Sequence, residues 1–255
     1  MRDVPPVVLT IAGSDPSGGA GLQADLRAIA AHAMYGAAVP TALTVQNTRG
    51  VSRVVVLDAA LVRDQLDAVL EDLPVAAVKI GMLGSAAVAA AVLDAVGAGG
   101  APVVLDPVIR SSSGAALLDD AGVAVLRERA AGLALITPNR AEAAALLGRG
   151  GSPDALAREL AAELGCHVLV TGGDADGACV DWLASDALRS WSAARIDTPH
   201  DHGTGCLLST SIACALAGGM ALLPAVEHGR ACVRKGLQDS LALGAGTGPV
   251  FLLSV

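Results

Sequence analysis

The sequence predicts a three-layer α/β/α domain, in which a mainly parallel central sheet is covered by helices on both faces. Short apolar, β-branched runs alternate along the whole chain with stretches rich in Ala and Leu, a pattern typical of parallel sheets wrapped by helices. The 255 residues suit one large domain of this kind. Only 2% of the residues are aromatic although 53% are hydrophobic, so the core must be built from Ala, Val, Leu and Ile.

The expected elements follow this alternation in chain order. The apolar, β-branched runs give strands at 7–12, 42–45, 54–57, 76–80, 103–105, 134–137, 168–170, 178–183 and 188–193. The Ala- and Leu-rich stretches give helices at 21–32, 61–70, 86–96, 121–129, 141–147, 153–164, 206–216 and 225–243. No internal repeat or linker interrupts this order, so residues 1–255 are expected to form a single domain.

Composition and charge argue against several classes of protein. The net charge of −8 and the lack of a basic cluster argue against nucleic-acid binding. The apolar runs are far shorter than the roughly 20 residues that cross a bilayer, and the N-terminus lacks the features of a signal peptide, so a cytoplasmic protein is expected. The five cysteines form no CxxC pair, which indicates neither a disulfide framework nor a zinc site. Four of them are expected to be small buried hydrophobes.

A short turn, Gly203, Thr204 and Gly205, leads into the apolar helix expected from residue 206. The first N–H groups of a helix have no partner within the helix, and the helix dipole adds positive potential there. Because glycine lets a bound anion approach the backbone closely, the turn is a candidate anion hole for phosphoryl transfer. The alternative is an ordinary tight turn before a buried helix.

Cys206 would be the first residue of that helix. The field of the helix N-terminus would favour its thiolate and lower its pKa, and the thiolate could then accept a proton from a substrate hydroxyl. The alternative, a packed free cysteine, is the commoner fate of a thiol.

Further polar residues follow the apolar runs, at the strand ends where open α/β sheets bind ligands. The segment GSDPSGGAG, residues 13–21, follows a strand and opens a helix, which makes a ligand contact plausible. It lacks the GxGxxG spacing of a dinucleotide-binding loop, which argues against a Rossmann dehydrogenase. Asp25, one turn into the next helix, either faces the same ligand or is a solvated first-turn residue. No P-loop motif occurs.

Asn139 and Glu142 stand three residues apart, where a strand ends and a helix begins. Such a pair can hold Mg²⁺ and its waters through oxygen atoms. A capping box explains the same spacing, and the spacing alone favours it. Asp106 ends another strand, where it either joins the outer shell of that ion or is a turn residue. His200 and His202 flank the glycine turn and are interpreted as solvent-facing, with phosphate binding or loop orientation as the alternative.

Six segments carry a family resemblance in this order: TIAGSDPSGGAGLQADL, ALTVQNTRGV, VKIGML, VVLDPV, LITPNRAEAAALL and HGTGCLLSTSIACALA. Together they resemble the hydroxymethylpyrimidine/phosphomethylpyrimidine kinases of thiamin biosynthesis, which belong to the ribokinase-like superfamily. The resemblance covers nearly the whole chain. It implies a ribokinase-like fold, a homodimer, and phosphorylation of 4-amino-5-hydroxymethyl-2-methylpyrimidine, of its monophosphate, or of both, with ATP and Mg²⁺.

The resemblance also implies roles for the residues at matching positions. Gly203, Thr204 and Gly205 would form the anion hole, and Cys206 would take the position of the catalytic aspartate of sugar kinases. The pyrimidine would lie among Gly13, Asp25, Gln46, Met82 and Val108. ATP would contact Asn139, Glu142, Thr171 and Gly173. Asp106 and Glu142 would serve Mg²⁺.

Two departures from the family pattern leave alternatives open. The family has lysines where this chain has Thr171 and Ser112, and their loss removes cations from a site that must stabilise spread negative charge. Arg110 could replace the second in part, although the two cations differ in geometry. One alternative is a kinase for pyridoxal or a related hydroxymethyl heteroaromatic. Another is a regulatory protein that binds the pyrimidine with weakened or lost catalysis.

Overall fold

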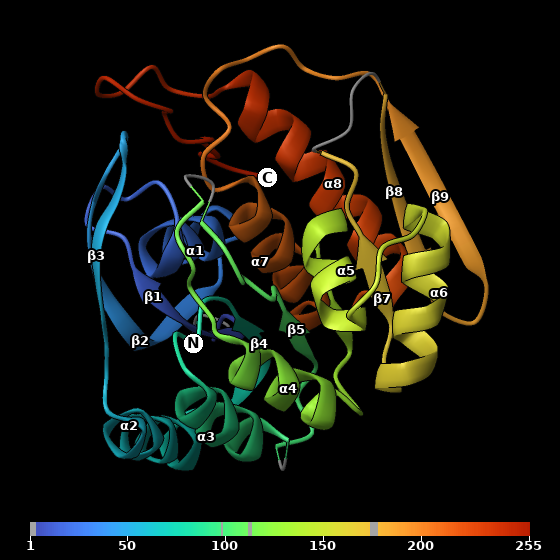
Figure 1. Ribbon diagram of the computed structural model, residues 1–255. Helices are drawn as coiled ribbons and strands as arrows, with labels where there is room; N and C mark the ends of the chain where they lie inside the picture. Colours follow the sequence, from blue (N-terminus) through green and yellow to red (C-terminus); the bar gives the residue numbers. More distant parts are fainter. Residues whose placement is uncertain (1–3, 98, 112–113, 174–177) are drawn as a thin grey trace.

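The computed structural model describes residues 4–97, 99–111, 114–173 and 178–255. Within these residues the chain forms a nine-stranded sheet with the order β3-β2-β1-β4-β5-β6-β7-β8-β9 (Figure 1). Neighbouring strands from β2 through β7 are parallel, whereas β3, β8 and β9 run antiparallel to the strands beside them. The predicted mainly parallel α/β architecture is therefore confirmed.

The strands are β1 (Val7–Ser14), β2 (Tyr35–Asn47), β3 (Gly50–Val56), β4 (Val75–Ile80), β5 (Val103–Leu105), β6 (Leu135–Ile136), β7 (Val168–Val170), β8 (Cys179–Ala184) and β9 (Leu188–Ala193). The helices are α1 (Gly21–Ala31), α2 (Ala59–Asp72), α3 (Ala86–Val96), α4 (Asp120–Arg129), α5 (Arg140–Leu147), α6 (Pro153–Leu164), α7 (Thr204–Ala217) and α8 (Leu222–Gln238). No helix in the described part of the chain is long and apolar enough to cross a membrane.

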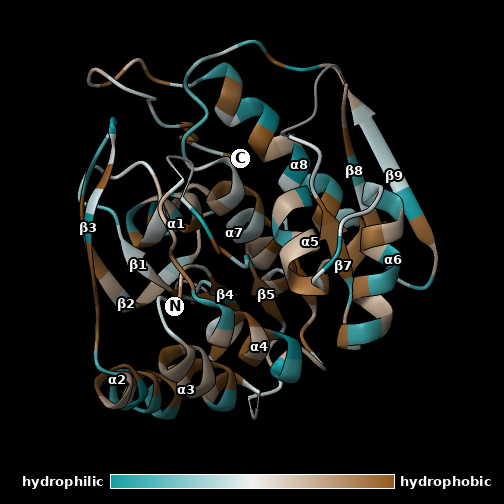
Figure 2. Ribbon diagram, viewed as in Figure 1, coloured by the Kyte–Doolittle hydropathy of each residue, from teal (hydrophilic) through white to brown (hydrophobic). Residues whose placement is uncertain are grey.

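Helices cover both faces of the sheet. One face carries α1, α7 and α8, and the other carries α2 to α6. Alternate side chains of β1 supply both layers, because Leu9 and Ile11 pack in the core under α2 to α6 and Val8 packs in the core under α7. Figure 2 shows apolar residues along the inner strands, whereas the edge strand β9 is largely hydrophilic.

Several predicted bounds match the structure, notably those of α3, α6, β5, β7 and β9. The predicted strands 42–45 and 54–57 are too short, since they are parts of the hairpin β2–β3. The part of β2 that the sequence did not indicate, residues 35–41, contains Gly36 and Pro40, and both residue types are depleted in strands. The pairing of β2 with β3 also shifts register between Val45 and Gln46.

The predicted last helix, 225–243, is wrong at both ends. The helix begins three residues earlier, which puts Pro224 in its first turn, where a proline has no helical hydrogen bond to lose. It ends at Gln238 because the chain then folds back towards the β2–β3 turn. There the Thr247 N–H donates to the Thr48 carbonyl at 2.9 Å.

Candidate active site

Polar side chains emerge on one face of three adjacent strands. Thr10 of β1 lies beside Lys79 of β4, and Lys79 lies beside Val104 of β5. Asp106 follows Val104 by two residues and therefore points to the same face. All three polar side chains are buried, and α1 and α7 cover this face. The layer between the sheet and α7 thus holds a cation and an acid close to the strand ends.

Lys79 and Asp25 form an ion pair inside this layer. The Lys79 Nζ lies 2.8 Å from Asp25 Oδ2, and both side chains are 0% exposed. Thr10 Oγ1 donates to the same carboxylate oxygen at 2.6 Å, and Thr210 Oγ1 donates to Oδ1 at 2.8 Å. Both oxygens of Asp25 are occupied by protein donors, so its interpretation as a solvated residue is wrong. Its contact with a pyrimidine stays a prediction.

The glycine turn forms the N-terminus of α7. Gly203 is the N-cap residue with a φ of 87°, and a Cβ there would collide with the Gly19 carbonyl, so the turn requires glycine. The Thr204 N–H donates to the Asp201 carbonyl at 3.3 Å. Within the described residues no side chain caps this helix, so no cap occupies the N–H groups of Gly205 and Cys206.

Cys206 is the third residue of α7 rather than its first, since the helix begins at Thr204, and its predicted thiolate character is wrong as well. Burial raises the pKa of the Cys206 thiol to about 12, and the carboxylates of Asp25 and Asp106 act in the same direction. The Lys79 ammonium and a hydrogen bond with the Gly21 backbone oppose this rise without reversing it. At neutral pH the side chain is therefore a neutral thiol.

Asp106 lies directly against the glycine turn. A Cβ on Gly205 would stand 3.4 Å from Asp106 Oδ2, and the Ser209 hydroxyl donates to the same oxygen at 3.4 Å. Burial raises the pKa of Asp106 to about 6 although Lys79 pulls it down. In turn, burial alone would lower the pKa of Lys79, but Asp25, Cys206 and Asp106 together hold it above its ordinary value. The pKa values of Lys79, Asp106 and Cys206 therefore depend on one another.

Asn139 and Glu142 form the capping box that their spacing predicts. Asn139 Oδ1 accepts the Glu142 N–H at 2.9 Å, and Glu142 Oε2 accepts the Asn139 N–H at 3.0 Å. Glu142 Oε1 also accepts the Ile109 N–H at 3.4 Å, which links α5 to the segment after β5. The buried carboxylate is thereby fixed near the loop that carries Asp106.

Gly13, Met82 and Val108 come together at the strand ends. A Cβ on Gly13 would lie 2.9 Å from the Met82 sulfur, and Met82 and Val108 belong to one apolar cluster with Ala42 and Leu117. The Met82 carbonyl accepts a hydrogen bond from the buried Thr41 hydroxyl at 2.6 Å, which fixes this segment. The structure thus brings three of the five expected pyrimidine contacts into one apolar surface.

Gln46 lies beside His202. The Gln46 amide nitrogen is 3.3 Å from His202 Nε2, which is itself 3.2 Å from Asp15 Oδ2. His202 is only 14% exposed, so its interpretation as a solvent-facing histidine is wrong. Burial opposes ionisation of Asp15, but the hydrogen bonds from His202 and from Ser17 and Ala20 hold the pKa of its carboxyl below its ordinary value. His200 is half-buried and accepts the Gly248 N–H at 3.1 Å.

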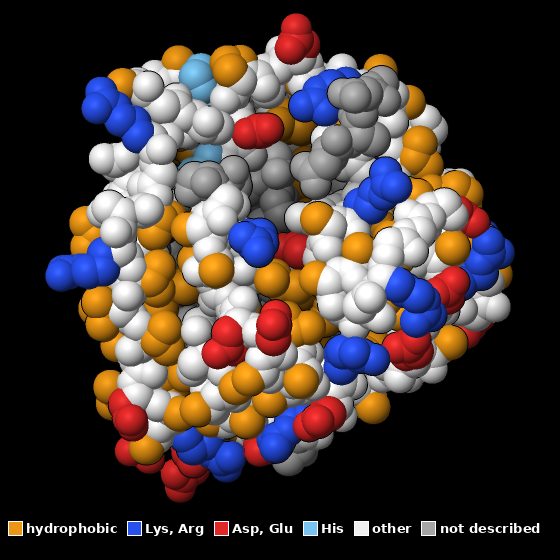
Figure 3. Space-filling view, viewed as in Figure 1, with side chains coloured by type: hydrophobic (Ala, Val, Ile, Leu, Met, Phe, Trp, Pro, Cys, Tyr) orange, Lys and Arg blue, Asp and Glu red, His pale blue; other side chains and the backbone are white. Residues whose placement is uncertain are grey.

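The remaining expected ATP contacts, Thr171 and Gly173, follow the end of β7. Thr171 forms a parallel bridge with Asn139, and its N–H donates to the Pro138 carbonyl at 3.0 Å. Gly173 is exposed, and Arg195 Nη1 donates to its carbonyl at 3.1 Å. The lysine position at Ser112 lies outside the described residues, and the exposed Arg110 bonds the Gly114 carbonyl at 3.4 Å. Figure 3 shows this face hollowed between the β2–β3 hairpin and α5, with charges of both signs around it.

A family model described as phosphomethylpyrimidine kinase matches residues 15–251. The chain belongs to the phosphomethylpyrimidine kinase family. The hydroxymethylpyrimidine/phosphomethylpyrimidine kinase of Rhizobium meliloti (strain 1021) is 46% identical over 254 residues, which cover 96% of each chain. The resemblance to this family is therefore confirmed, and the chain is a phosphotransferase.

Two solved structures confirm the ribokinase-like fold of this kinase. Phosphomethylpyrimidine kinase from Clostridium difficile 630 has a TM-score of 0.78 at 34% identity and covers 90% of this chain and 98% of its own. An ADP complex of Bacillus subtilis pyridoxal kinase has a TM-score of 0.88 at 29% identity, with 97% of both chains covered.

Sequence reasoning missed three residues of this kinase site. Lys79 is one of them, and a single lysine within an apolar strand is a signal of a buried, paired charge. Asp15 and His202 were not connected, because they are 187 residues apart in the chain. The expected burial of four cysteines holds for Cys214 and Cys232, whereas Cys166 and Cys179 are half-buried.

Proposed function

We propose that this kinase transfers the γ-phosphoryl group of ATP to 4-amino-5-hydroxymethyl-2-methylpyrimidine, to its monophosphate, or to both, in thiamin biosynthesis. The observation that carries the proposal is the N-terminus of α7, where the uncapped N–H groups of Gly205 and Cys206 stand above the buried Lys79. Preorganised donors of this kind stabilise charge that develops in the transition state. The relatives named for this activity match the chain over nearly its full length.

The pyrimidine is proposed to lie on the apolar surface of Gly13, Met82 and Val108. The amide of Gln46 has both a donor and an acceptor, as the edge of an aminopyrimidine requires. His202 and Asp15 hold that amide from the side of the glycine turn. Asp25 acts through Lys79, since its oxygens are already occupied.

In the proposed reaction the hydroxymethyl oxygen attacks the γ-phosphorus, the bond from phosphorus to the β,γ-bridging oxygen of ATP breaks to release ADP, and the hydroxyl proton passes to water. For the monophosphate, a phosphate oxygen attacks in the same way. The backbone donors of Gly205 and Cys206 hold the charge on the transferred group. Cys206 remains a neutral thiol that orients the attacking hydroxyl, because its pKa is raised to about 12.

Asp106 and Glu142 fit a magnesium ion by their chemistry, because Mg²⁺ prefers carboxylate oxygens and keeps waters and substrate phosphates as its other ligands. Both carboxylates are buried: Asp106 lies against Gly205, and Glu142 is fixed by the backbone N–H groups of Asn139 and Ile109. When bound, the ion would neutralise part of the phosphate charge. Asn139, Thr171 and Gly173 are proposed to border the nucleotide.

The family has lysines at the positions of Thr171 and Ser112, and in this chain the positive charge of the site comes from other groups. Lys79 supplies a buried cation beneath the turn, and Arg195 stands beside the Gly173 carbonyl at the edge of the proposed nucleotide site. The N-terminus of α7 adds the field of a helix dipole. We therefore infer that catalysis is retained.

The decisive experiment incubates the purified protein with the hydroxymethylpyrimidine, ATP and Mg²⁺ and follows the products by mass spectrometry. We expect the monophosphate, the diphosphate, or both, with matching release of ADP. Cys206→Ala should reduce turnover about 100-fold with little change in pyrimidine affinity, while Cys179→Ala serves as the matched control. Tight pyrimidine binding without any ADP release would overturn the kinase assignment and favour a regulatory role.

The pyridoxal kinase likeness supports a second candidate substrate. Pyridoxal also carries a hydroxymethyl group on a heteroaromatic ring, and the fold match to a pyridoxal kinase has a TM-score of 0.88. A panel of both substrates at equal concentration, read by kcat/KM, separates the two. We expect the pyrimidine to be preferred, and a higher kcat/KM for pyridoxal would reverse the assignment.

The remaining proposals concern assembly and location. The chain is proposed to form one kinase domain over residues 1–255 and to act as a homodimer in the cytoplasm, with ATP and the aminopyrimidine as its partners and no nucleic acid or membrane involved. Light scattering after gel filtration gives the mass of the particle, and a mass of one chain, 25.1 kDa, would exclude the dimer.

A further inference from the structure

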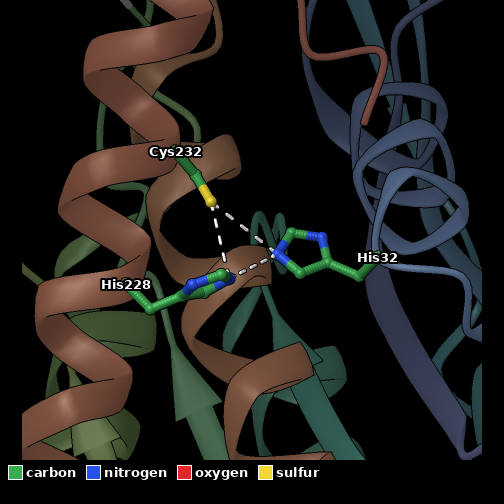
Figure 4. A group of neighbouring side chains, drawn as sticks. All are labelled: His32, His228 and Cys232. Atoms are coloured by element: carbon green, nitrogen blue, oxygen red, sulfur yellow. Dashed lines mark hydrogen bonds between the residues drawn. The ribbon is translucent and has the colours of Figure 1, made fainter. Parts of the chain in front are cut away.

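Three potential metal ligands meet at the far end of α1 from the kinase site. His32 is the C-cap residue of α1, and His228 and Cys232 lie one turn apart on α8 (Figure 4). The 11 residues of α1 separate His32 from the loop before Gly21 by about 16 Å. In the described part of the chain, no other group of three or more His, Cys, Asp and Glu side chains has the spacing of a metal site.

The distances within this cluster match those between the ligands of a tetrahedral zinc ion. His32 Nε2 and His228 Nε2 are 3.0 Å apart, and Cys232 Sγ is 3.8 Å from the first and 3.6 Å from the second. Zinc–nitrogen bonds of about 2.0–2.1 Å and zinc–sulfur bonds of about 2.3 Å at tetrahedral angles give about 3.3 Å between nitrogens and about 3.6 Å from nitrogen to sulfur. The rings stand at 71° to each other with both Nε2 atoms directed at the same point (Figure 4).

The hydrogen bonding of His32 prepares its Nε2 as a ligand. His32 Nδ1 lies 2.7 Å from the Ala28 carbonyl, which can only accept, so Nδ1 carries the proton and the lone pair of Nε2 faces the cluster. A second-shell carbonyl of this kind is the usual partner of a zinc-bound histidine.

A buried hydroxyl lies next to the third ligand. Ser211 of α7 is 0% exposed, and its Oγ is the one fully buried side-chain polar atom in the described chain without a partner at hydrogen-bond distance. Ser211 lies beside the Cys232 thiol. A thiolate on a bound cation would give the Ser211 hydroxyl an acceptor.

We propose that His32, His228 and Cys232 bind one Zn²⁺ ion, with a water in the fourth position. Two imidazoles and one thiolate favour zinc over the magnesium used with ATP, which prefers oxygen. The ion ties the end of α1 to α8, and α8 packs on α7, which carries the glycine turn. No sequence pattern indicates this site, because the site holds only one cysteine and its two histidines, His32 and His228, are 196 residues apart in the chain.

The test uses metal-free protein reduced with a phosphine, which does not compete for zinc. Co²⁺ is titrated as a spectroscopic probe, and we expect one equivalent to give a thiolate-to-cobalt charge-transfer band and the intense visible bands of tetrahedral Co²⁺, both removed by Zn²⁺. Cys232→Ser should abolish the charge-transfer band, and His228→Gln should weaken affinity at least about tenfold. Cys179→Ser and His167→Gln, outside the cluster, are the matched controls.

A second measurement uses the unaltered chain, so that the test does not depend on variants that fail to fold. One equivalent of Zn²⁺ should protect Cys232 from alkylation, read peptide by peptide, while Cys166 and Cys179 react as before. Absence of stoichiometric Co²⁺ and Zn²⁺ binding would overturn the site and leave a hydrogen-bonded pair of histidines beside a thiol. Binding that persists in both Cys232→Ser and His228→Gln would overturn it as well, by assigning the metal elsewhere.

Discussion

Lys79 and Asp25 face each other across the layer between β4 and α1, with Nζ 2.8 Å from Oδ2 and neither side chain exposed. The hydroxyls of Thr10 and Thr210 complete the coordination of the carboxylate. Removing two charges from water costs several kcal/mol each, and the mutual attraction offsets this cost only while both partners are present. The stability of the fold therefore depends on the Lys79–Asp25 pair, which also fixes the Lys79 cation beneath the glycine turn.

Replacing Lys79 by Met should destabilise the protein by about 3–5 kcal/mol, because Asp25 is left as a buried, uncompensated charge. Urea unfolding followed by circular dichroism measures this loss. Lys235→Met removes the exposed pair with Asp239 and should cost less than about 1 kcal/mol. The double variant Lys79→Met/Asp25→Asn should recover part of the loss. A Lys79→Met protein as stable as the unaltered chain would contradict the account of the pair.

The fold was predictable because its signals are local. Helix 86–96 is rich in Ala and Val, and helix 153–164 opens with Pro at its first position, so both bounds follow from residues near in sequence. The full length of β2 was not predictable, since residues 35–41 contain Gly36 and Pro40, which are depleted in strands, and are held in the sheet by pairing with β1. The same limit applies to the end of α8, which is set by the return of residues near Thr247 to Thr48.

The candidate site was predictable in its composition and not in its electrostatics. The glycine turn and the Asn139–Glu142 box follow from short motifs, and both have the expected local geometry. The pKa of Cys206 was predicted in the wrong direction, because a helix N-terminus is a local feature whereas burial and the carboxylates of Asp25 and Asp106 come from distant segments. Sequence alone could not show that these groups share one buried layer.

Asp106 should make the stability and the activity of the kinase depend on pH in opposite directions. Its pKa is about 6 in the folded chain against an ordinary value of 3.8, so the folded state binds more protons between these values. The free energy of unfolding should therefore fall as the pH rises from about 4 to about 6, and the contribution of Asp106 should stay lost above that. The apparent affinity for Mg²⁺ should rise over the same range, because the ion requires the carboxylate.

Asp106→Asn tests both effects. At pH 8 the variant should be more stable than the unaltered protein by about 1–3 kcal/mol, because a buried charge is removed. Its kcat should fall at least about 100-fold if Asp106 serves the metal. Urea unfolding and ADP release measure the two quantities, and Asp197→Asn, at an exposed position, is the control. A variant with normal kcat would remove Asp106 from the proposed magnesium site.

Cys206 should react as a neutral thiol. With its pKa raised to about 12, alkylation by iodoacetamide at pH 7.5 should be at least about 100-fold slower than that of an unfolded cysteine, and the rate should still rise towards pH 10. Peptide mapping by mass spectrometry gives the rate for each cysteine, and the urea-unfolded protein is the control. Fast alkylation at neutral pH would show that Cys206 is a thiolate, and would support its role as the base that accepts the substrate's proton.

A neutral thiol at Cys206 also predicts which substitutions of this residue lower kcat most. If the thiol orients the attacking hydroxyl rather than accepting its proton, Cys206→Ser keeps a polar group in place and should retain kcat within about tenfold, whereas Cys206→Ala should lose about 100-fold. The kcat of the unaltered enzyme should show no rise between pH 7 and 9 from a titrating thiol. Equal losses in the two variants would argue that the sulfur itself is required.

Gly203 and Gly219 offer a matched test of the anion hole. Both have left-handed backbone, with φ of 87° and 83°, so alanine at either position should cost about 1–2 kcal/mol from backbone strain. A Cβ on Gly219 meets nothing within 4 Å, whereas one on Gly203 runs into the Gly19 carbonyl and must move the turn. Gly219→Ala should therefore keep normal kcat, and Gly203→Ala should lose at least about 100-fold, because displaced N–H donors no longer face the transferred phosphoryl group. Steady-state kinetics beside urea unfolding separates strain from chemistry. Equal kcat values in the two variants would mean that the turn supports the fold and not the reaction.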